Sequence, residues 1–150
     1  MIFTNARLIF PNGIRDGSEL VVEQGKIAAI RLPTPRLRRT SGQNQENEII
    51  DLNGNYLAPG FIDLHVHGAR GRDTLEASTE AFRVICNFHA SGGTTSLLLT
   101  AATAPLDEIL TVLQAVRDSR TAISAIAGVH VAVIGNEIAN GSEPAFEQQI

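Results

Sequence analysis

The chain has 150 residues and a mass of 16.1 kDa, which suffices for one ordinary domain or two small ones. It is shorter than the roughly 250 residues of a complete (β/α)8 barrel. The formal net charge is −4, from 16 acidic and 12 basic residues, so no global positive field would attract nucleic acid or an anionic membrane. We therefore expect no nucleic-acid partner and no membrane partner.

Cysteine usage and the apolar stretches indicate the compartment. Cys86 is the single cysteine, which excludes an internal disulfide and a zinc site built from cysteines. The first ten residues lack a basic leader with a continuous apolar core, and the apolar stretch 122–135 is too short to span a bilayer. These features predict a soluble, cytoplasmic protein.

The first third of the chain predicts β structure. Residues 2–10 have strand character, a turn signal follows at 11–13, and two short apolar runs flank residues 23–25 as in a tight hairpin. Residues 33–48 contain one large apolar residue and predict an exposed loop, where the cluster Arg36, Arg38 and Arg39 favours a solvated surface over an anion site. Strand character returns at 49–52. We expect residues 1–58 to form a small, β-sandwich-like domain with antiparallel pairing.

Beyond residue 59 the pattern changes to alternating strands and helices. Strands are expected at 61–67, 94–103 and 125–134, and helices at 78–91 and 103–120. The order β-α-β-α-β, with strands apolar on both faces, is typical of a parallel sheet covered by helices. The predicted fold class is therefore α/β: the small N-terminal β domain, then the first βαβαβ units of an incomplete TIM-like barrel at 59–135, and a polar tail at 136–150.

Both helices show start, stop and packing signals. Thr103 is expected to cap the second helix with Pro105 in its first turn, and Gly92 to end the first helix. The second helix is expected to bury one stripe, formed by Leu106, Ile109, Leu110, Leu113 and Val116. The first helix is expected to place Phe82, Ile85, Cys86 and His89 on one face, where Cys86 is buried and structural.

The strongest functional signal lies in the strand at 61–67. Successive side chains of a strand point to opposite faces, so Asp63, His65 and His67 project together while Ile62, Leu64 and Val66 pack on the other side. Imidazole is a good ligand for zinc and similar divalent ions. The spacing alone also fits surface histidines or a hydrogen-bonded pair. Their position at the carboxyl end of a first barrel strand favours a metal site.

Three further residues have two interpretations each. Asp63 either orients an imidazole or closes a local hydrogen bond. His130 lies in a buried strand and is either a hydrogen-bonded core histidine or a site residue. His89, near a helix end, favours packing or a contact with the helix dipole over metal ligation.

Residues 57–68 resemble the start of the barrel in the amidohydrolase superfamily, and residues 92–100, 104–106 and 127–131 resemble the N-acetylglucosamine-6-phosphate deacetylase family. The resemblance covers about residues 1–131 and is specific from residue 57 onward. It implies a metal-dependent hydrolase that removes the N-acetyl group from an amino-sugar phosphate. It also implies that His65 and His67 ligate a divalent metal, zinc or a similar ion.

One departure from that family concerns its central metal ligand. The family has a carboxylate two residues after the histidine of the third strand, where this chain has Ala132. We do not expect Glu137, Glu143 or Glu147 to replace it. The family's later metal histidines, catalytic aspartate and phosphate-binding residues belong to later barrel units, so no catalytic or substrate-binding residue is assigned here.

Three interpretations follow, and whether the chain is an enzyme stays open among them. It is an active deacetylase whose missing ligands come from elsewhere, a truncated or frame-altered relic that is inactive alone or binds a partner, or a dihydroorotase-like amidohydrolase. The sequence favours the second, with weak or absent metal binding and no turnover by this chain alone. The sheet with its open edge is expected to be prone to aggregation unless a partner or a homo-oligomer covers it.

Overall fold

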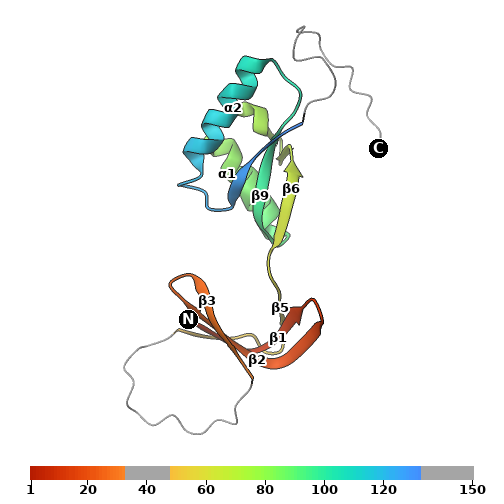
Figure 1. The fold of residues 1–150 in the computed structure, drawn as a ribbon, viewed down its shortest axis with the longest axis vertical. Helices are drawn as coiled ribbons and strands as arrows, with labels where there is room; N and C mark the ends of the chain where they lie inside the picture. The colour runs from red at the N-terminus through yellow and green to blue at the C-terminus, as the bar shows by residue number, and fades with distance from the viewer. Residues whose placement is uncertain (33–47, 133–150) are drawn as a thin grey trace. The chain divides into compact units, whose positions relative to one another are not determined.

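The computed structural model describes residues 1–32 and 48–132, and the chain divides into two compact units, Met1–Pro59 and Gly60–Ile150 (Figure 1). The expected arginine-containing loop and the expected polar tail fall on residues 33–47 and 133–150, which lie outside the described part. No helix within the described ranges is long and apolar enough to cross a lipid bilayer.

The described strands of unit 1 form one five-stranded sheet. β1 (Ile2–Phe10) pairs antiparallel with β2 (Gly13–Glu23), which pairs antiparallel with β3 (Lys26–Arg31). β4 (Ile49–Asp51) and β5 (Tyr56–Leu57) pair with β1 in parallel, so the expectation of antiparallel pairing is wrong for these two. Parallel pairing needs a long connection between the paired strands, and β2 and β3 lie between β1 and β4 in the chain. The single sheet also differs from the sandwich expected for residues 1–58.

Unit 2 has the β-α-β-α-β order that the sequence predicts. The strands β6 (Phe61–Val66), β9 (Thr94–Ala101) and β10 (Ile126–Val131) form a parallel sheet in the order β10-β9-β6. α1 (Thr79–Ser91) and α2 (Leu106–Ser119) connect them. Between β6 and α1 lie a short antiparallel hairpin, β7 (Gly68–Ala69) and β8 (Arg72–Asp73), and the 3-10 helix η1 (Thr74–Glu76).

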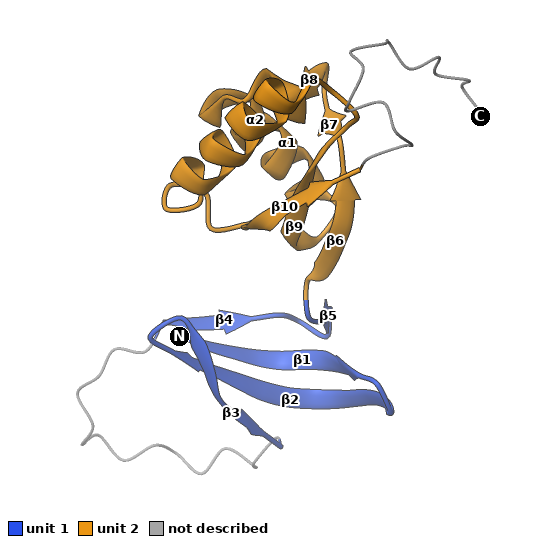
Figure 2. Ribbon diagram, turned by 45° about the horizontal axis from the view of Figure 1, so that its top comes forward, with its two compact units in different colours: residues 1–59 blue, residues 60–150 orange. Residues whose placement is uncertain are grey.

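The core of unit 2 lies between the sheet and the two helices, which cover the same face of the sheet (Figure 2). Its fully buried large apolar side chains come from α1, β9 and α2: Phe82, Ile85, Leu97, Leu99, Val112 and Val116. Burying each such side chain contributes about 1.5–3 kcal/mol, so this layer supports the sheet edge on which the candidate site lies.

The observed helix boundaries confirm the expected end of the first helix and correct the expected start of the second. α1 begins after Ser78, whose hydroxyl accepts a hydrogen bond from the Ala81 backbone N–H at 3.2 Å, and it ends at Gly92 as expected. α2 begins only at Leu106, with Pro105 at its N-cap and no side-chain cap. Thr103 therefore does not cap α2. The residue before a proline avoids helical geometry, which prevents the helix from starting earlier.

The buried stripe of α2 also differs from the expected one. Leu106 is 56% exposed and Leu110 is 54% exposed. Ile109 and Val116 are buried as expected, and Val112 and Ser119 are the other buried side chains of the helix. Ser119 Oγ lies 2.7 Å from Thr79 Oγ1 and links the two helices. Both stripes have helical spacing, and the contact with α1 selects between them.

On the side of β6 that was expected to pack inward, only the end of the strand is buried. Val66 is 4% exposed, as expected, whereas Ile62 is 69% and Leu64 is 63% exposed. The expectation that all three pack inward is therefore wrong for two of them. β6 is an edge strand of the sheet, and within residues 48–132 no helix covers these two side chains.

Candidate functional site

The carboxyl ends of three parallel strands meet at one edge of the unit 2 sheet. β6 brings His65, and His67 follows directly after this strand. β9 brings Thr100 and β10 brings His130, which the strand register places opposite each other. Parallel α/β proteins place binding and catalytic groups at this edge.

The two histidines of β6 point their Nε2 atoms at each other. These atoms are 2.9 Å apart, and the ring centroids are 4.7 Å apart with the ring planes at 78°. Strand alternation puts both side chains on one face, which is the convergence that the sequence predicts. Two nitrogens bound to one zinc ion at about 2.0–2.1 Å lie about 2.9–3.4 Å from each other for ligand angles between octahedral and tetrahedral values. The pair therefore fits two positions of a single divalent metal, and this role stays a prediction.

A hydrogen bond on the far side of the His67 ring fixes its tautomer. His67 Nδ1 lies 3.1 Å from the carbonyl oxygen of Thr100. A carbonyl oxygen only accepts, so Nδ1 carries the proton and Nε2 presents its lone pair. His65 Nε2 is then the donor in the 2.9 Å contact. Metal-binding histidines typically donate their other ring N–H to a carbonyl or carboxylate in this way.

Two fully buried threonines hold the strand end in place. Thr100 Oγ1 accepts a hydrogen bond from the Val66 backbone N–H at 3.0 Å and donates to the Leu98 carbonyl at 3.3 Å. The Thr74 backbone N–H donates to the His67 carbonyl at 2.7 Å, and its hydroxyl donates to the Val66 carbonyl at 3.4 Å. Sequence reasoning missed both. Thr100 lies in an apolar strand, where threonine is typical simply as a good strand former, and Thr74 lies in the short 3-10 helix η1, for which no signal was identified.

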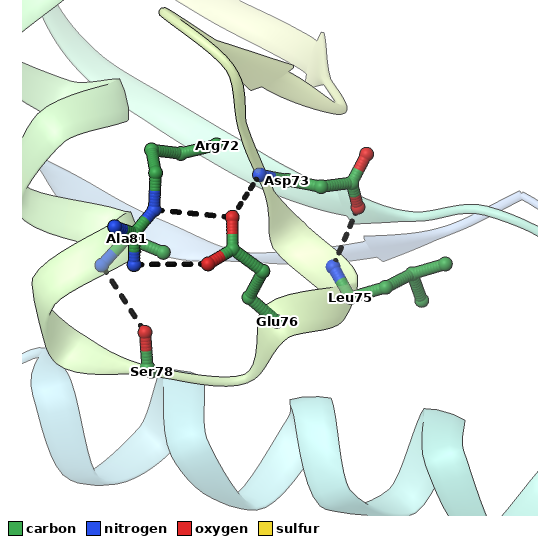
Figure 3. A network of polar contacts seen from close by, with 6 residues as sticks. All are labelled: Arg72, Asp73, Leu75, Glu76, Ser78 and Ala81. Carbon is green, nitrogen blue, oxygen red and sulfur yellow. Dashed lines mark hydrogen bonds and ion pairs between the residues drawn. The ribbon is translucent and has the colours of Figure 1, made fainter.

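A capped turn follows the hairpin that leaves His67 (Figure 3). Asp73 Oδ1 accepts from the Leu75 backbone N–H at 2.7 Å, and Glu76 Oε1 accepts from the Asp73 backbone N–H at 2.7 Å. Arg72 pairs with Glu76 at 2.9 Å. This reciprocal capping box starts η1, whose first residue donates its backbone N–H to the His67 carbonyl.

Three other candidate residues do not join the histidine pair. Asp63 Oδ1 accepts from the His65 backbone N–H at 3.1 Å, so it closes a local hydrogen bond and does not orient an imidazole. The His89 ring packs edge-on against Phe88, with centroids 5.3 Å apart. Cys86 is buried, and burial raises the pKa of its thiol, so it is a structural residue with little thiolate at neutral pH.

His130 lies beside the pair. Its ring centroid is 5.1 Å from that of His65, with the ring planes at 62°. Its Nδ1 is buried and has no hydrogen-bond partner among the described residues, and the same holds for Nε2 of His89, so this feature alone does not separate a core histidine from a site residue. Ala132, two residues on, continues the sheet through its N–H to the Ala101 carbonyl at 3.0 Å and offers only a methyl group.

No set of three His, Cys, Asp or Glu side chains in residues 1–32 and 48–132 is already placed to hold a metal ion. The strand ends therefore supply two converging nitrogens and a neighbouring third ring. The three glutamates weighed as replacements, Glu137, Glu143 and Glu147, lie outside the described residues.

Comparisons with known sequences agree on one family of hydrolases. The model of the amidohydrolase family matches residues 56–146. A dihydroorotase of Bacillus cytotoxicus is 32% identical over 111 residues, which is 71% of this chain and 22% of that protein. An N-acetylglucosamine-6-phosphate deacetylase of Lysinibacillus sphaericus is 31% identical over 107 residues, which is 71% of this chain and 26% of that protein.

Solved structures show the same fold. The crystal structure of N-acetylglucosamine-6-phosphate deacetylase from Pasteurella multocida matches with a TM-score of 0.72 and 30% identity, over 87% of this chain and 33% of that one. The deacetylase from Thermotoga maritima matches with a TM-score of 0.67 and 27% identity, over 91% of this chain and 34% of that one. These matches confirm the predicted fold class. The chain spans about a quarter of the length of the curated relatives it matches and about a third of these structures.

Proposed function

The chain belongs to the amidohydrolase family, and we propose that it supplies the first metal-binding strand of a hydrolase that removes the acetyl group from an N-acetylated amino-sugar phosphate. The observation that carries the proposal is the pair of Nε2 atoms of His65 and His67, 2.9 Å apart at the carboxyl end of β6. The deacetylases among the relatives and the solved structures support this substrate class.

The metal and the residues of this chain would supply different parts of the chemistry. A divalent ion, when bound, lowers the pKa of a water and polarises the amide carbonyl. The residues of this chain position the ligands: the Thr100 carbonyl keeps the proton on His67 Nδ1, so that His67 Nε2 is available. Asp63 steadies the backbone at His65.

Proton transfer to the leaving amine needs a further acid and base. Asp63 is the carboxylate on the histidine face of β6, and its Oδ1 is engaged by the His65 backbone N–H. The described strand ends therefore bind and orient without completing hydrolysis. We expect the 150-residue chain alone to release no measurable acetate from N-acetylglucosamine 6-phosphate.

A dihydroorotase-type ring opening is the second candidate. It is favoured by the dihydroorotases of Bacillus cytotoxicus and Staphylococcus epidermidis, which are 32% and 31% identical over the matched residues. Both candidate reactions are hydrolyses of a carbon–nitrogen bond, so the histidine pair does not distinguish between them. The substrate does.

Metal analysis of the purified chain tests the histidine pair. The wild-type chain, His65→Ala and His67→Ala are loaded with zinc, dialysed and analysed for bound metal. His89→Ala is the matched control, because this histidine packs on Phe88 away from the pair. The sequence alone led to an expectation of weak or absent metal binding, and the convergence of the two Nε2 atoms revises it. We expect the wild-type chain and the control to retain zinc and the first two variants to lose it. Equal zinc content in all four proteins would overturn the proposal.

A hybrid enzyme tests the substrate class. Residues 56–132 replace the matching segment of the Pasteurella multocida deacetylase, with Ala132→Glu as a companion variant that restores a carboxylate. We expect acetate release from N-acetylglucosamine 6-phosphate in the companion variant and none after a further His65→Ala change. A companion hybrid that folds, binds zinc and releases no acetate would contradict this substrate class, and ring opening of dihydroorotate by a hybrid built on a dihydroorotase would favour the second candidate.

A further inference from the structure

We propose that a divalent metal at the strand ends of unit 2 is held by three imidazoles, those of His65, His67 and His130. His130 then takes the place of the anionic ligand that Ala132 does not provide. The inference rests on the proposed role of the His65–His67 pair and extends it to a third ligand on a different strand.

The separations of His65 from the other two rings fit one shared ion. Imidazoles that bind one zinc through nitrogens at about 2.0–2.1 Å have ring centroids about 4.5–5.3 Å apart, for ligand angles between octahedral and tetrahedral values. The centroid of His65 lies 4.7 Å from that of His67 and 5.1 Å from that of His130. Both separations fall within this range, and His65 is the shared neighbour.

The His130 ring carries an unsatisfied nitrogen. Its Nδ1 is buried and has no hydrogen-bond partner in the described part of the chain, and an unpaired buried polar atom costs free energy. His67 differs, because its Nδ1 is fixed by the Thr100 carbonyl. The described residues do not yet place three donors at metal-binding distance, so ligation requires the His130 ring to turn toward the pair. Among residues 1–32 and 48–132, no hydrogen bond from its Nδ1 opposes this turn.

The donor set determines the kind of ion. Three neutral imidazoles form the ligand set of a zinc site that keeps a fourth position open. Nitrogen-only donors favour zinc or cobalt over magnesium and calcium, which prefer oxygen. Ala132 is on the same side of the strand as His130 by alternation, and its methyl group adds no charge. The site is therefore expected to retain the full positive charge of the ion.

Nitrogen NMR of the wild-type chain tests the third ligand directly. Long-range proton–nitrogen spectra of the four histidines are recorded while zinc is added to the full 150-residue chain. We expect one ring nitrogen each of His65, His67 and His130 to shift at one equivalent of zinc. His89 is the internal control and is expected to keep its spectrum.

Two matched variants give an independent readout. Cobalt affinity is measured from the visible absorption of the bound ion in His130→Gln and His89→Gln. We expect the affinity to fall at least about tenfold in His130→Gln and to stay unchanged in His89→Gln. Circular dichroism establishes that each variant is folded, and the wild-type spectra decide the matter if His130→Gln unfolds.

The outcomes separate the two proposals. Zinc shifts of His65 and His67 without a shift of His130 would overturn the three-imidazole site and leave the proposed function in place. The absence of any histidine shift would overturn both.

Discussion

Replacing Thr100 with valine removes one hydroxyl from the centre of the strand-end structure. The Thr100 side chain is fully buried, and its Oγ1 accepts from the Val66 backbone N–H at 3.0 Å. Valine has nearly the same shape, so the substitution leaves no cavity. The Thr100 carbonyl, which accepts from His67 Nδ1, is retained. The variant therefore isolates the hydroxyl that joins β9 to the end of β6.

The expected cost follows from the group left unpaired. A buried N–H that loses its acceptor destabilises the native state by about 1–3 kcal/mol. A loss of about 2 kcal/mol lowers the equilibrium constant for folding roughly 30-fold. For a unit of this size, it lowers the midpoint of thermal unfolding by about 8–16 °C.

Urea and thermal unfolding, followed by far-UV circular dichroism, measure this loss. Thr111→Val is the matched control, because its hydroxyl donates to the Asp107 carbonyl on the exposed side of α2 at 2.8 Å. The control is expected to change the unfolding free energy by less than about 0.5 kcal/mol. Equal stability of Thr100→Val and Thr111→Val would refute the role assigned to the Thr100 hydroxyl.

Three further predictions concern unit 2. Gly68→Ala would drive a Cβ into the Arg72 carbonyl oxygen, so we expect urea unfolding to show a loss of about 1–3 kcal/mol of stability. Gly92→Ala is the control that should stay near wild type, because its Cβ would meet only a 3.4 Å contact. Ala132→Glu adds an anionic oxygen at the strand end and should raise zinc affinity at least about tenfold in competition with a chelating dye, whereas unchanged affinity would place this position away from the metal. Burial raises the pKa of the Cys86 thiol, so a thiol reagent should label the native chain slowly until the pH exceeds the ordinary pKa of a thiol. The same reagent should label the urea-unfolded chain quickly, and fast labelling of the native chain at neutral pH would contradict the burial of Cys86.

The sequence by itself determined the features that depend on local backbone geometry. The period of two along β6 places His65 and His67 on one face, and the rings converge there in the structure. Gly92 ends α1 as the sequence indicates, because capping depends on only a few neighbouring residues. The alternation of strands and helices followed from the same local patterns.

The tertiary structure decided which side chains meet across strands and which faces are covered. His130 contacts His65 because β10 and β6 flank β9 in parallel, an arrangement that no local pattern specifies. Thr100 supports Val66 through the same register. Ile62 stays exposed because β6 is at the edge of the sheet, although its strand pattern resembles that of a buried one. Backbone period is a property of neighbouring residues, whereas strand order and register depend on the packing of the whole unit.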